Sequence, residues 1–171
     1  LINEFPRLRL LIAPRHPERA SQIEGLIKKF GFTPVRISRL NLSTNLPTNT
    51  VFILDTIGQL VSFYAIADIV FVGGSFIKKG GQNILEPAFF SKAIIFGPYM
   101  FNFRQISKLY LERQAARMVP GKEELFREIK SLLSNPGQLK SMGSRAKQLI
   151  SENQGATVRN VQELSLFISH G

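Results

Sequence analysis

The sequence predicts an α/β fold in which a parallel sheet is doubly wound, with helices on both faces. Short apolar segments recur along the chain, and segments with apolar residues at helical spacing separate most of them. Several of the apolar segments end at a glycine or proline turn. Alternating strands and helices form parallel sheets, and 171 residues are enough for one domain with a sizeable core.

The predicted elements follow one another in regular order. Short apolar runs predict strands at 8–13, 33–37, 51–54, 69–72, 93–96 and 116–119. Helical spacing predicts helices at 19–30, 57–67, 83–90, 103–114, 122–134, 136–152 and 156–168. Gly31 ends the first helix, and Asp55 or Thr56 can cap the second. The Asn-, Thr- and Pro-rich residues 41–50 are expected to form a loop.

Turn residues that suit ligand binding follow four of the predicted strands. They stand after the first, third, fourth and fifth strands, at Pro14-Arg15-His16, 55–58, 73–75 and 97–98. Ligands of open parallel sheets bind beyond the carboxyl ends of the strands. We therefore expect these residues along one rim of the sheet.

The most informative segment is 71–88, in which two glycine pairs separate a strand from a helix that begins near Asn83 and Glu86. Unpaired backbone N–H groups and the positive end of the helix dipole favour phosphate at such a turn. The carboxylate of Glu86 can accept hydrogen bonds from sugar hydroxyls. The segment predicts a nucleotide or nucleotide-sugar pocket, and the alternative is a tight strand-to-helix turn without a ligand.

The composition limits the classes of partner. Lys and Arg total 22 against 12 acidic residues, and the resulting charge of +10 can attract nucleic acid, anionic lipid headgroups or phosphorylated small molecules. The basic residues are scattered, without a ribonucleoprotein or zinc-finger motif, so we expect no nucleic-acid partner. Two His, no Cys and no carboxylate cluster predict no metal site and no cofactor. No apolar run approaches the roughly 18 residues that span a bilayer.

Five motifs resemble the C-terminal half of the bacterial 3-deoxy-manno-octulosonic acid (Kdo) transferases. In chain order they are IAPRHPER (12–19), LDTIGQL (54–60), FVGGSF (71–76), GGQNILEPA (80–88) and IIFGPYMFNF (94–103). These enzymes transfer Kdo from CMP-Kdo to the lipid A precursor of lipopolysaccharide. The resemblance implies a GT-B glycosyltransferase, with a Rossmann-like C-terminal domain for the nucleotide donor and an N-terminal domain for the acceptor.

The resemblance also implies how the chain is organised. We expect residues 1–171 to form the CMP-Kdo binding domain, with 122–171 as its helical C-terminal part. The chain opens on LINEFP, which resembles the end of a helix, so we expect an N-terminal acceptor domain that is absent from this sequence. The family places the catalytic base, a Glu, in that domain. We therefore expect no catalytic residue here and no activity from this fragment alone.

The residues and the resemblance together assign a nucleotide-binding set. It comprises Pro14, Arg15, Ile57, Gly58, Gln59, Gly74, Ser75, Asn83, Ile84, Leu85 and Glu86. Arg15 is a candidate cation for the CMP phosphate, and Ser75 is either a hydrogen-bond donor to the ligand or the residue that closes the turn. The chain departs from the family where Gln59 replaces the usual Glu and Gln82 the usual His, so Gln82 cannot titrate near neutral pH.

The family's acceptor is a lipid, so the resemblance implies peripheral attachment at the cytoplasmic face of the bacterial inner membrane. The positive charge fits an anionic membrane surface there. Two alternatives remain open from the residues alone: another nucleotide-sugar enzyme of the same fold, such as a UDP-sugar transferase or epimerase, or a non-enzymatic nucleotide- or RNA-binding module. Preference for CMP over UMP favours the Kdo hypothesis, and steeply salt-dependent RNA binding favours the last alternative.

Overall fold

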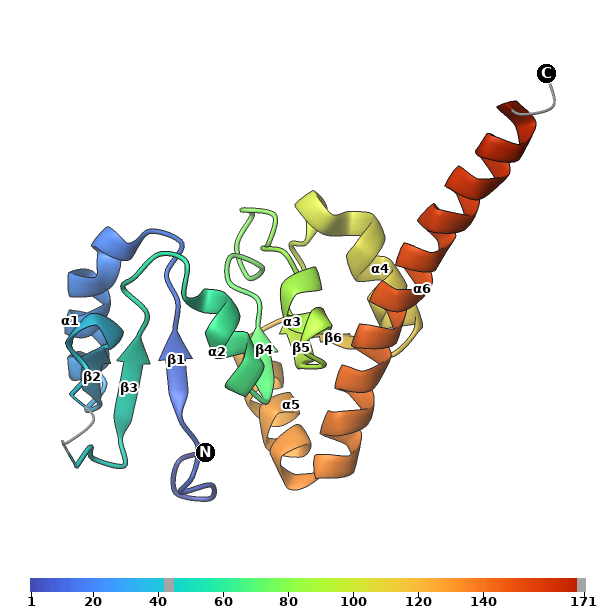
Figure 1. Cartoon of the computed structure of the whole chain (residues 1–171). Coiled ribbons are helices and arrows are strands. Elements are labelled where there is room, and N and C mark those ends of the chain that lie inside the picture. Colours follow the sequence, from blue (N-terminus) through green and yellow to red (C-terminus); the bar gives the residue numbers. More distant parts are fainter. Residues whose placement is uncertain (42–44, 169–171) are drawn as a thin grey trace. The chain divides into compact units, whose positions relative to one another are not determined.

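The computed structural model alternates strands and helices, and hydrogen bonding divides the strands between two parallel sheets (Figure 1). Residues 1–41 and 45–168 are described, the segment 154–168 by its backbone alone. The described chain consists of two compact units, residues 1–63 and 64–171, each containing one three-stranded sheet. The predicted parallel α/β architecture is therefore confirmed, although the strands pair in two sheets where one was expected.

Unit 1 is a small α/β layer. Its strand order is β1 (Leu10–Ile12), β3 (Thr50–Ile53) and β2 (Thr33–Arg36), so β3 lies at the centre. The helix α1 (Ala20–Lys29) packs on β2 and β3. The short 3-10 turns η1 (Pro17–Arg19) and η2 (Ile37–Arg39) precede α1 and follow β2.

The core of unit 1 comes from one face of its sheet and one stripe of α1. Ala20 and Ile27 lie two turns apart on the same face of α1 and pack against Val51 and Ile53. Val51 and Ile53 share one face of β3 because side chains alternate along a strand. As predicted, α1 ends just before Gly31, whose positive φ of 78° suits glycine. The sequence pattern of apolar residues therefore locates this core correctly.

Unit 2 is larger and is wound on both faces. Its sheet has the order β4 (Ile69–Phe71), β5 (Ala93–Phe96) and β6 (Ala116–Met118). The helices are α3 (Leu85–Phe89), α4 (Arg104–Glu112), α5 (Lys122–Ser134) and α6 (Pro136–Ile168), and a 3-10 turn η3 (Phe101–Phe103) leads into α4. The helix α2 (Leu60–Ile66) spans the boundary between the units.

The central strand β5 separates two hydrophobic cores. All four of its residues are buried, and its side chains alternate between the faces. Ile94 and Phe96 face a core built with α3, α4 and the middle of α6, whereas Ala93 and Ile95 face a core built with α5 and the start of α6. This continuously apolar strand is typical of a sheet covered by helices on both faces.

The helix α6 contributes to both cores of unit 2. Met142 packs with the α5 face, and Ala146, one turn later, packs with the α3 and α4 face. Gly143 lies between them against the backbone turn that follows α3, where an added Cβ would overlap the carbonyl oxygen of Ser91. The hydroxyl of Tyr110 in α4 donates to the carbonyl oxygen of Ala146 at 3.2 Å, which ties α4 to the same stretch of helix.

Some predicted boundaries are wrong. The segment predicted as two helices, 136–152 and 156–168, is one helix in the structure (Figure 1), because a single glycine at 155 costs only about 1 kcal/mol in a run of helix-forming residues. The helix predicted from residue 57 begins at Leu60, since Gly58 adopts a positive φ of 85°. The helix predicted from residue 83 begins at Leu85. Of the predicted loop 41–50, residues 42–44 lie outside the described part of the chain, and Thr50 belongs to β3.

The remaining global features concern the first residues and membrane spans. Residues 1–5 form a turn, in which the backbone N–H groups of Glu4 and Phe5 donate to the carbonyl oxygen of Leu1. Within the described residues, none of the helices has the length and apolar character that crossing a bilayer requires. The organisation of residues 1–171 as a single donor-binding domain stays a prediction.

Replacement of Gly143 by Ala should destabilise the chain. Ala has the higher helix propensity, but its Cβ would overlap the carbonyl of Ser91, so α6 must shift away from the turn. We expect a loss of about 1–3 kcal/mol in the free energy of unfolding, measured by denaturant titration. Gly137→Ala is the matched control, because its nearest neighbour, the Oδ1 of Asn135, would lie at an ordinary 3.6 Å. Equal stability of the two variants would contradict the close packing.

Candidate functional site

The predicted residues of unit 1 lie in the loops after β1 and β3. These strands pair in parallel, from Leu10 with Val51 to Ile12 with Ile53, so their carboxyl ends meet at one edge. Pro14 is half-buried, and Arg15 beside it is exposed and makes no ion pair or hydrogen bond among the described residues. A guanidinium held after a strand without a protein partner is available to an anionic ligand.

The loop after β3 is fixed by side-chain hydrogen bonds. Asp55 accepts hydrogen bonds from both the backbone N–H of Ser38, at 3.0 Å, and its hydroxyl. Partial burial alone would raise the pKa of the Asp55 carboxyl, but the two Ser38 donors, a further backbone hydrogen bond and the positive charge of Arg36 together hold the pKa below its usual range. Asp55 therefore stays ionised near neutral pH and joins the ends of β2 and β3, a structural role that suits it better than that of a general base.

The rest of this loop presents backbone and an exposed apolar side chain. The hydroxyl of Thr56 donates to the Oε1 of Gln59, and Gly58 between them has a positive φ of 85°. The side chain of Ile57 is 88% exposed, which is unusual for its type. Residues 57–59 therefore form a turn whose shape depends on Gly58 and whose surface is open to a ligand.

In unit 2 the loop after β4 is anchored by a buried serine. Ser75 is fully buried, its hydroxyl donates to the carbonyl of Val72 at 2.6 Å, and it accepts from the backbone N–H of Gly97 at 2.7 Å. An added Cβ at Gly97 would overlap the carbonyl oxygen of Ser75, so only glycine permits this approach. Two roles were considered for Ser75: closing the turn and donating a hydrogen bond to the ligand. In the structure its hydroxyl makes the hydrogen bonds that close the turn, and ligand contact stays a prediction.

The second glycine pair shapes the outer part of the same loop. Gly80 and Gly81 have positive φ values of 85° and 72°. An added Cβ would overlap the side chain of Asn102 at the first position and that of Met100 at the second. The loop 73–83 therefore folds tightly onto the segment that follows β5. Met100 and Asn102 belong to the motif at 94–103, but only the tertiary fold shows that they contact the glycine pair.

Asn83 organises the start of α3. Its Oδ1 accepts from the backbone N–H of Leu85 at 3.0 Å, and its Nδ2 lies 3.3 Å from the Oε1 of Glu86. Ile84 is fully buried in the core, whereas Leu85 and Glu86 are exposed. Because α3 has only five residues and Asn83 occupies one of its first N–H groups, its dipole is a weaker anion site than the sequence suggested.

Tyr64 lies close enough to Glu86 for the two groups to interact. Burial, together with the negative charge of Glu86, raises the pKa of the Tyr64 phenol to about 12. The phenol is therefore neutral at physiological pH and can act as a hydrogen-bond donor. A lone Tyr in an amphipathic helix gives no sequence signal of this proximity.

The sequence-predicted residues thus fall into two local groups. Pro14 and Arg15 follow β1 and residues 57–59 follow β3, so both segments leave the same edge of the unit 1 sheet. It brings Gly74 and Ser75 together with residues 83–86 in the loop between β4 and α3 of unit 2. Among the described residues, no group of three or more His, Cys, Asp or Glu side chains is placed to hold a metal ion.

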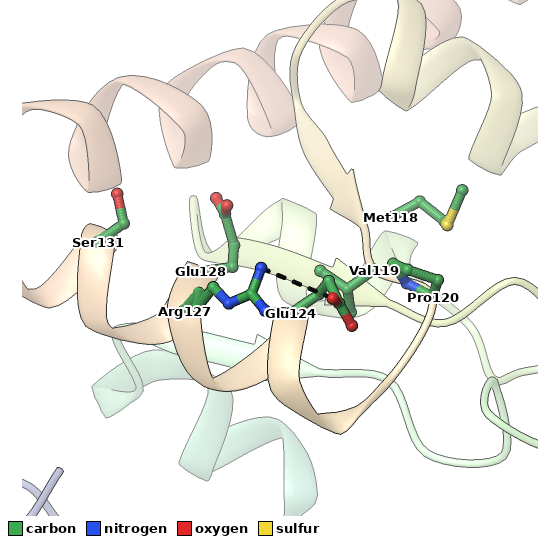
Figure 2. Close-up of a pocket in the computed structure, with 7 residues that line it drawn as sticks. All are labelled: Met118, Val119, Pro120, Glu124, Arg127, Glu128 and Ser131. Carbon is green, nitrogen blue, oxygen red and sulfur yellow. Dashed lines mark ion pairs between the residues drawn. The ribbon is translucent and has the colours of Figure 1, made fainter.

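A shallow pocket of about 370 Å³ lies elsewhere in unit 2, between the end of β6 and α5 (Figure 2). It is lined by Met118, Val119, Pro120, Glu124, Arg127, Glu128 and Ser131. Figure 2 shows Arg127 turned toward Glu124, 3.7 Å away, and Glu128 is paired with Arg117 at 3.4 Å. Its charged side chains are paired with each other or with Arg117 outside the lining, and it contains no predicted site residue, so we assign it no ligand.

Comparison with known proteins identifies the relatives of the chain. It is 36% identical over 170 residues to the 3-deoxy-D-manno-octulosonic acid transferase of Haemophilus influenzae, covering 98% of this chain and 39% of that protein. The transferase of Rickettsia felis is 34% identical over 98% of the chain, with 36% of that protein covered. The chain thus spans about two fifths of the length of these relatives. No protein-family model matches.

A solved structure has the same fold. The C-terminal CMP-Kdo binding domain of WaaA from Acinetobacter baumannii superimposes with a TM-score of 0.78 and 26% sequence identity, covering 87% of this chain and 77% of that domain. The predicted Rossmann-like fold class is confirmed by this match. The predicted resemblance to the Kdo transferases is confirmed by the sequence relatives.

Replacement of Ser75 by Ala should destabilise unit 2. The change leaves the N–H of Gly97 and the carbonyl of Val72 without their hydrogen-bond partner in a buried place. Leaving buried polar groups unsatisfied costs about 1–3 kcal/mol, so we expect a loss of that size in denaturant titration. Ser131→Ala, at an exposed position on α5, is the control and should change stability by less than about 0.5 kcal/mol. A neutral Ser75→Ala would show that the hydroxyl does not hold the loop.

Proposed function

We propose that this homologue of the Kdo transferases, with the fold of a C-terminal CMP-Kdo binding domain, binds CMP-Kdo as a glycosyl donor. The observation that carries the proposal is the structural match over 87% of the chain to a domain described by that ligand. The sequence relatives support the same donor because they are Kdo transferases matched over nearly the entire chain.

The complete enzyme would transfer Kdo to the lipid A precursor of lipopolysaccharide. Transfer requires a base that deprotonates the acceptor hydroxyl and a site that stabilises the leaving CMP. We assign the base to an N-terminal acceptor domain and the donor site to residues 1–171, with 122–171 as the helical part of the donor domain. By this assignment the chain binds the donor but does not complete the reaction alone.

Stabilisation of the CMP phosphate is assigned to Arg15 and to backbone N–H groups of the glycine loops. Arg15 is exposed and lacks an ion-pair partner among the described residues, so its charge is available. Gly74 has a positive φ of 75°, a conformation that suits glycine, and its lack of a side chain keeps bulk away from the loop backbone. Pro14 and residues 57–59 complete the unit 1 contribution, and Ser75 and Ile84 hold the loop from inside.

Recognition of the ribose is assigned to Glu86. Its exposed carboxylate can accept hydrogen bonds from both ribose hydroxyls, and the amide of Asn83 at 3.3 Å restrains its orientation. Leu85, exposed beside it, contributes apolar contact. A carboxylate that accepts from vicinal hydroxyls distinguishes a ribonucleotide from its deoxy analogue.

We also propose that the enzyme works at an anionic membrane surface, peripherally attached to the cytoplasmic face of the bacterial inner membrane. A lipid acceptor requires access to the bilayer. The net charge of +10 supports attraction to anionic headgroups, since each basic residue near such a surface contributes about 1 kcal/mol.

Titration of the chain with CMP should perturb the backbone amide NMR signals of residues 74–75 and 83–86. The affinity is expected to be weak because the chain spans only about two fifths of the length of the relatives that it matches. CMP should bind more tightly than UMP, which is the control that separates Kdo transfer from a UDP-sugar activity. Changes confined to residues 120–171, or equal binding of CMP and UMP, would contradict the proposal.

Glu86→Ala should weaken CMP binding by about 1.5–3 kcal/mol, the range for hydrogen bonds to charged groups. Deoxy-CMP should bind the wild type less tightly than CMP and should bind the variant about as tightly as CMP does. Isothermal titration of both ligands with both proteins gives the four affinities. A Glu86→Ala variant that loses the same affinity for both ligands would indicate that Glu86 supports the loop and does not contact the 2′-hydroxyl.

A further inference from the structure

Two loops of unit 2 form an exposed surface that the donor site does not use. We call it the basic–apolar tip and define it by Ile77, Lys78, Lys79, Phe101 and Arg104. Ile77 and Phe101 are 53% and 49% exposed, and the three basic side chains are also exposed. The loop after β4 and the turn before α4 rise at the same end of this unit (Figure 1).

Hydrogen bonds hold the two parts of the tip together. The Nδ2 of Asn102 donates to the carbonyl of Lys79, and its backbone N–H donates to the carbonyl of Gly80, each at 3.3 Å. The N–H of Lys79 donates to the carbonyl of Ile77 at 2.6 Å, which folds the loop tightly between them. The side chains of the tip are therefore displayed by a defined backbone.

The charge of the tip is uncompensated. Residues 73–83 and 97–105 contain no Asp or Glu. Within the described part of the chain, Lys78, Lys79 and Arg104 make no ion pair. By contrast, the half-exposed Phe126 of α5 lies on a helix that carries both acidic and basic residues, such as Glu123 and Arg127.

Apolar side chains between unpaired cations match the interface of an anionic bilayer. Side chains such as Ile and Phe gain free energy when they enter the acyl boundary, while Lys and Arg reach the headgroup phosphates. A soluble phosphorylated ligand would use the cations but would leave the two apolar side chains exposed to water. We propose that the basic–apolar tip docks unit 2 on an anionic phospholipid membrane.

The inference rests on the proposed function, because it locates the membrane contact of a transferase whose acceptor is a lipid. The loop that carries Lys78 and Lys79 also carries Gly74 and Asn83, so contact of the tip with lipid brings the donor-binding loop to the bilayer surface. The tip follows the carboxyl ends of β4 and β5, the edge at which ligands of parallel sheets bind.

Co-sedimentation with vesicles of phosphatidylglycerol and phosphatidylcholine, against pure phosphatidylcholine, tests the tip with the 171-residue chain. The chain should bind only the anionic vesicles. Lys78→Gln combined with Lys79→Gln should lower the partition coefficient about twentyfold if both side chains reach the headgroups. The control, Lys28→Gln combined with Lys29→Gln, removes the same charge from α1 beside the exposed Phe30. It should lower binding by less than about twofold.

Phe101→Ser should lower binding about fivefold, because half of this side chain is available to the acyl boundary. Phe126→Ser, at a similarly exposed Phe, should leave binding unchanged, and circular dichroism checks that both variants fold. Equal losses of vesicle binding for the two lysine pairs would show that only net charge matters and would contradict docking through the tip. A loss of binding only with the Lys28 and Lys29 pair would place the membrane contact on unit 1 and would also contradict docking through the tip. CMP affinity, measured in parallel, tests the proposed function separately: CMP binding without vesicle binding rejects only the tip.

Discussion

The attachment of the β4–α3 loop to the end of β5 is the constraint on which the candidate site of unit 2 depends. The buried hydroxyl of Ser75 bridges the carbonyl of Val72 and the N–H of Gly97, and Gly97 has no side chain that would prevent this approach. Two further contacts, of Gly80 with Asn102 and of Gly81 with Met100, hold the outer loop on the same segment. A loop with four glycines, which would otherwise have high conformational entropy, is thereby fixed in one shape.

The fixed loop is supported by a sheet that cannot easily shift. All four residues of β5 are buried between two cores, and α6 contributes to both. Packing at this density resists small displacements, so the end of β5 is a stable reference for the residues hydrogen-bonded to it. The half-buried Asn83 and the exposed Glu86 are positioned by buried neighbours, Ile84 on one side and Ala88 on the other.

The sequence was most informative where a residue's role is local. Periodicity located the strands and most helices, and the glycine pairs located the loop, because these signals depend on residues close in the chain. It failed at Gly155, where one glycine does not end a helix, and it could not divide the strands between two sheets, since pairing is decided by tertiary contacts. The contact of Asn102 with Gly80 and the interaction of Tyr64 with Glu86 were missed for the same reason. The role of Ser75 could not be assigned from the sequence, because its hydroxyl is buried against the distant Gly97.

The loop 73–83 combines three roles because its residues face three environments. Ser75 and Gly81 face the interior and fix the backbone, Asn83 stands next to the carboxylate of Glu86 at the start of α3, and Ile77 with Lys78 and Lys79 faces solvent. The proposed nucleotide contact and the proposed membrane contact therefore lie on one segment of the chain. Buried hydrogen bonds and close glycine contacts fix the backbone of this loop, and its exposed residues are the ones to which the proposed function is assigned.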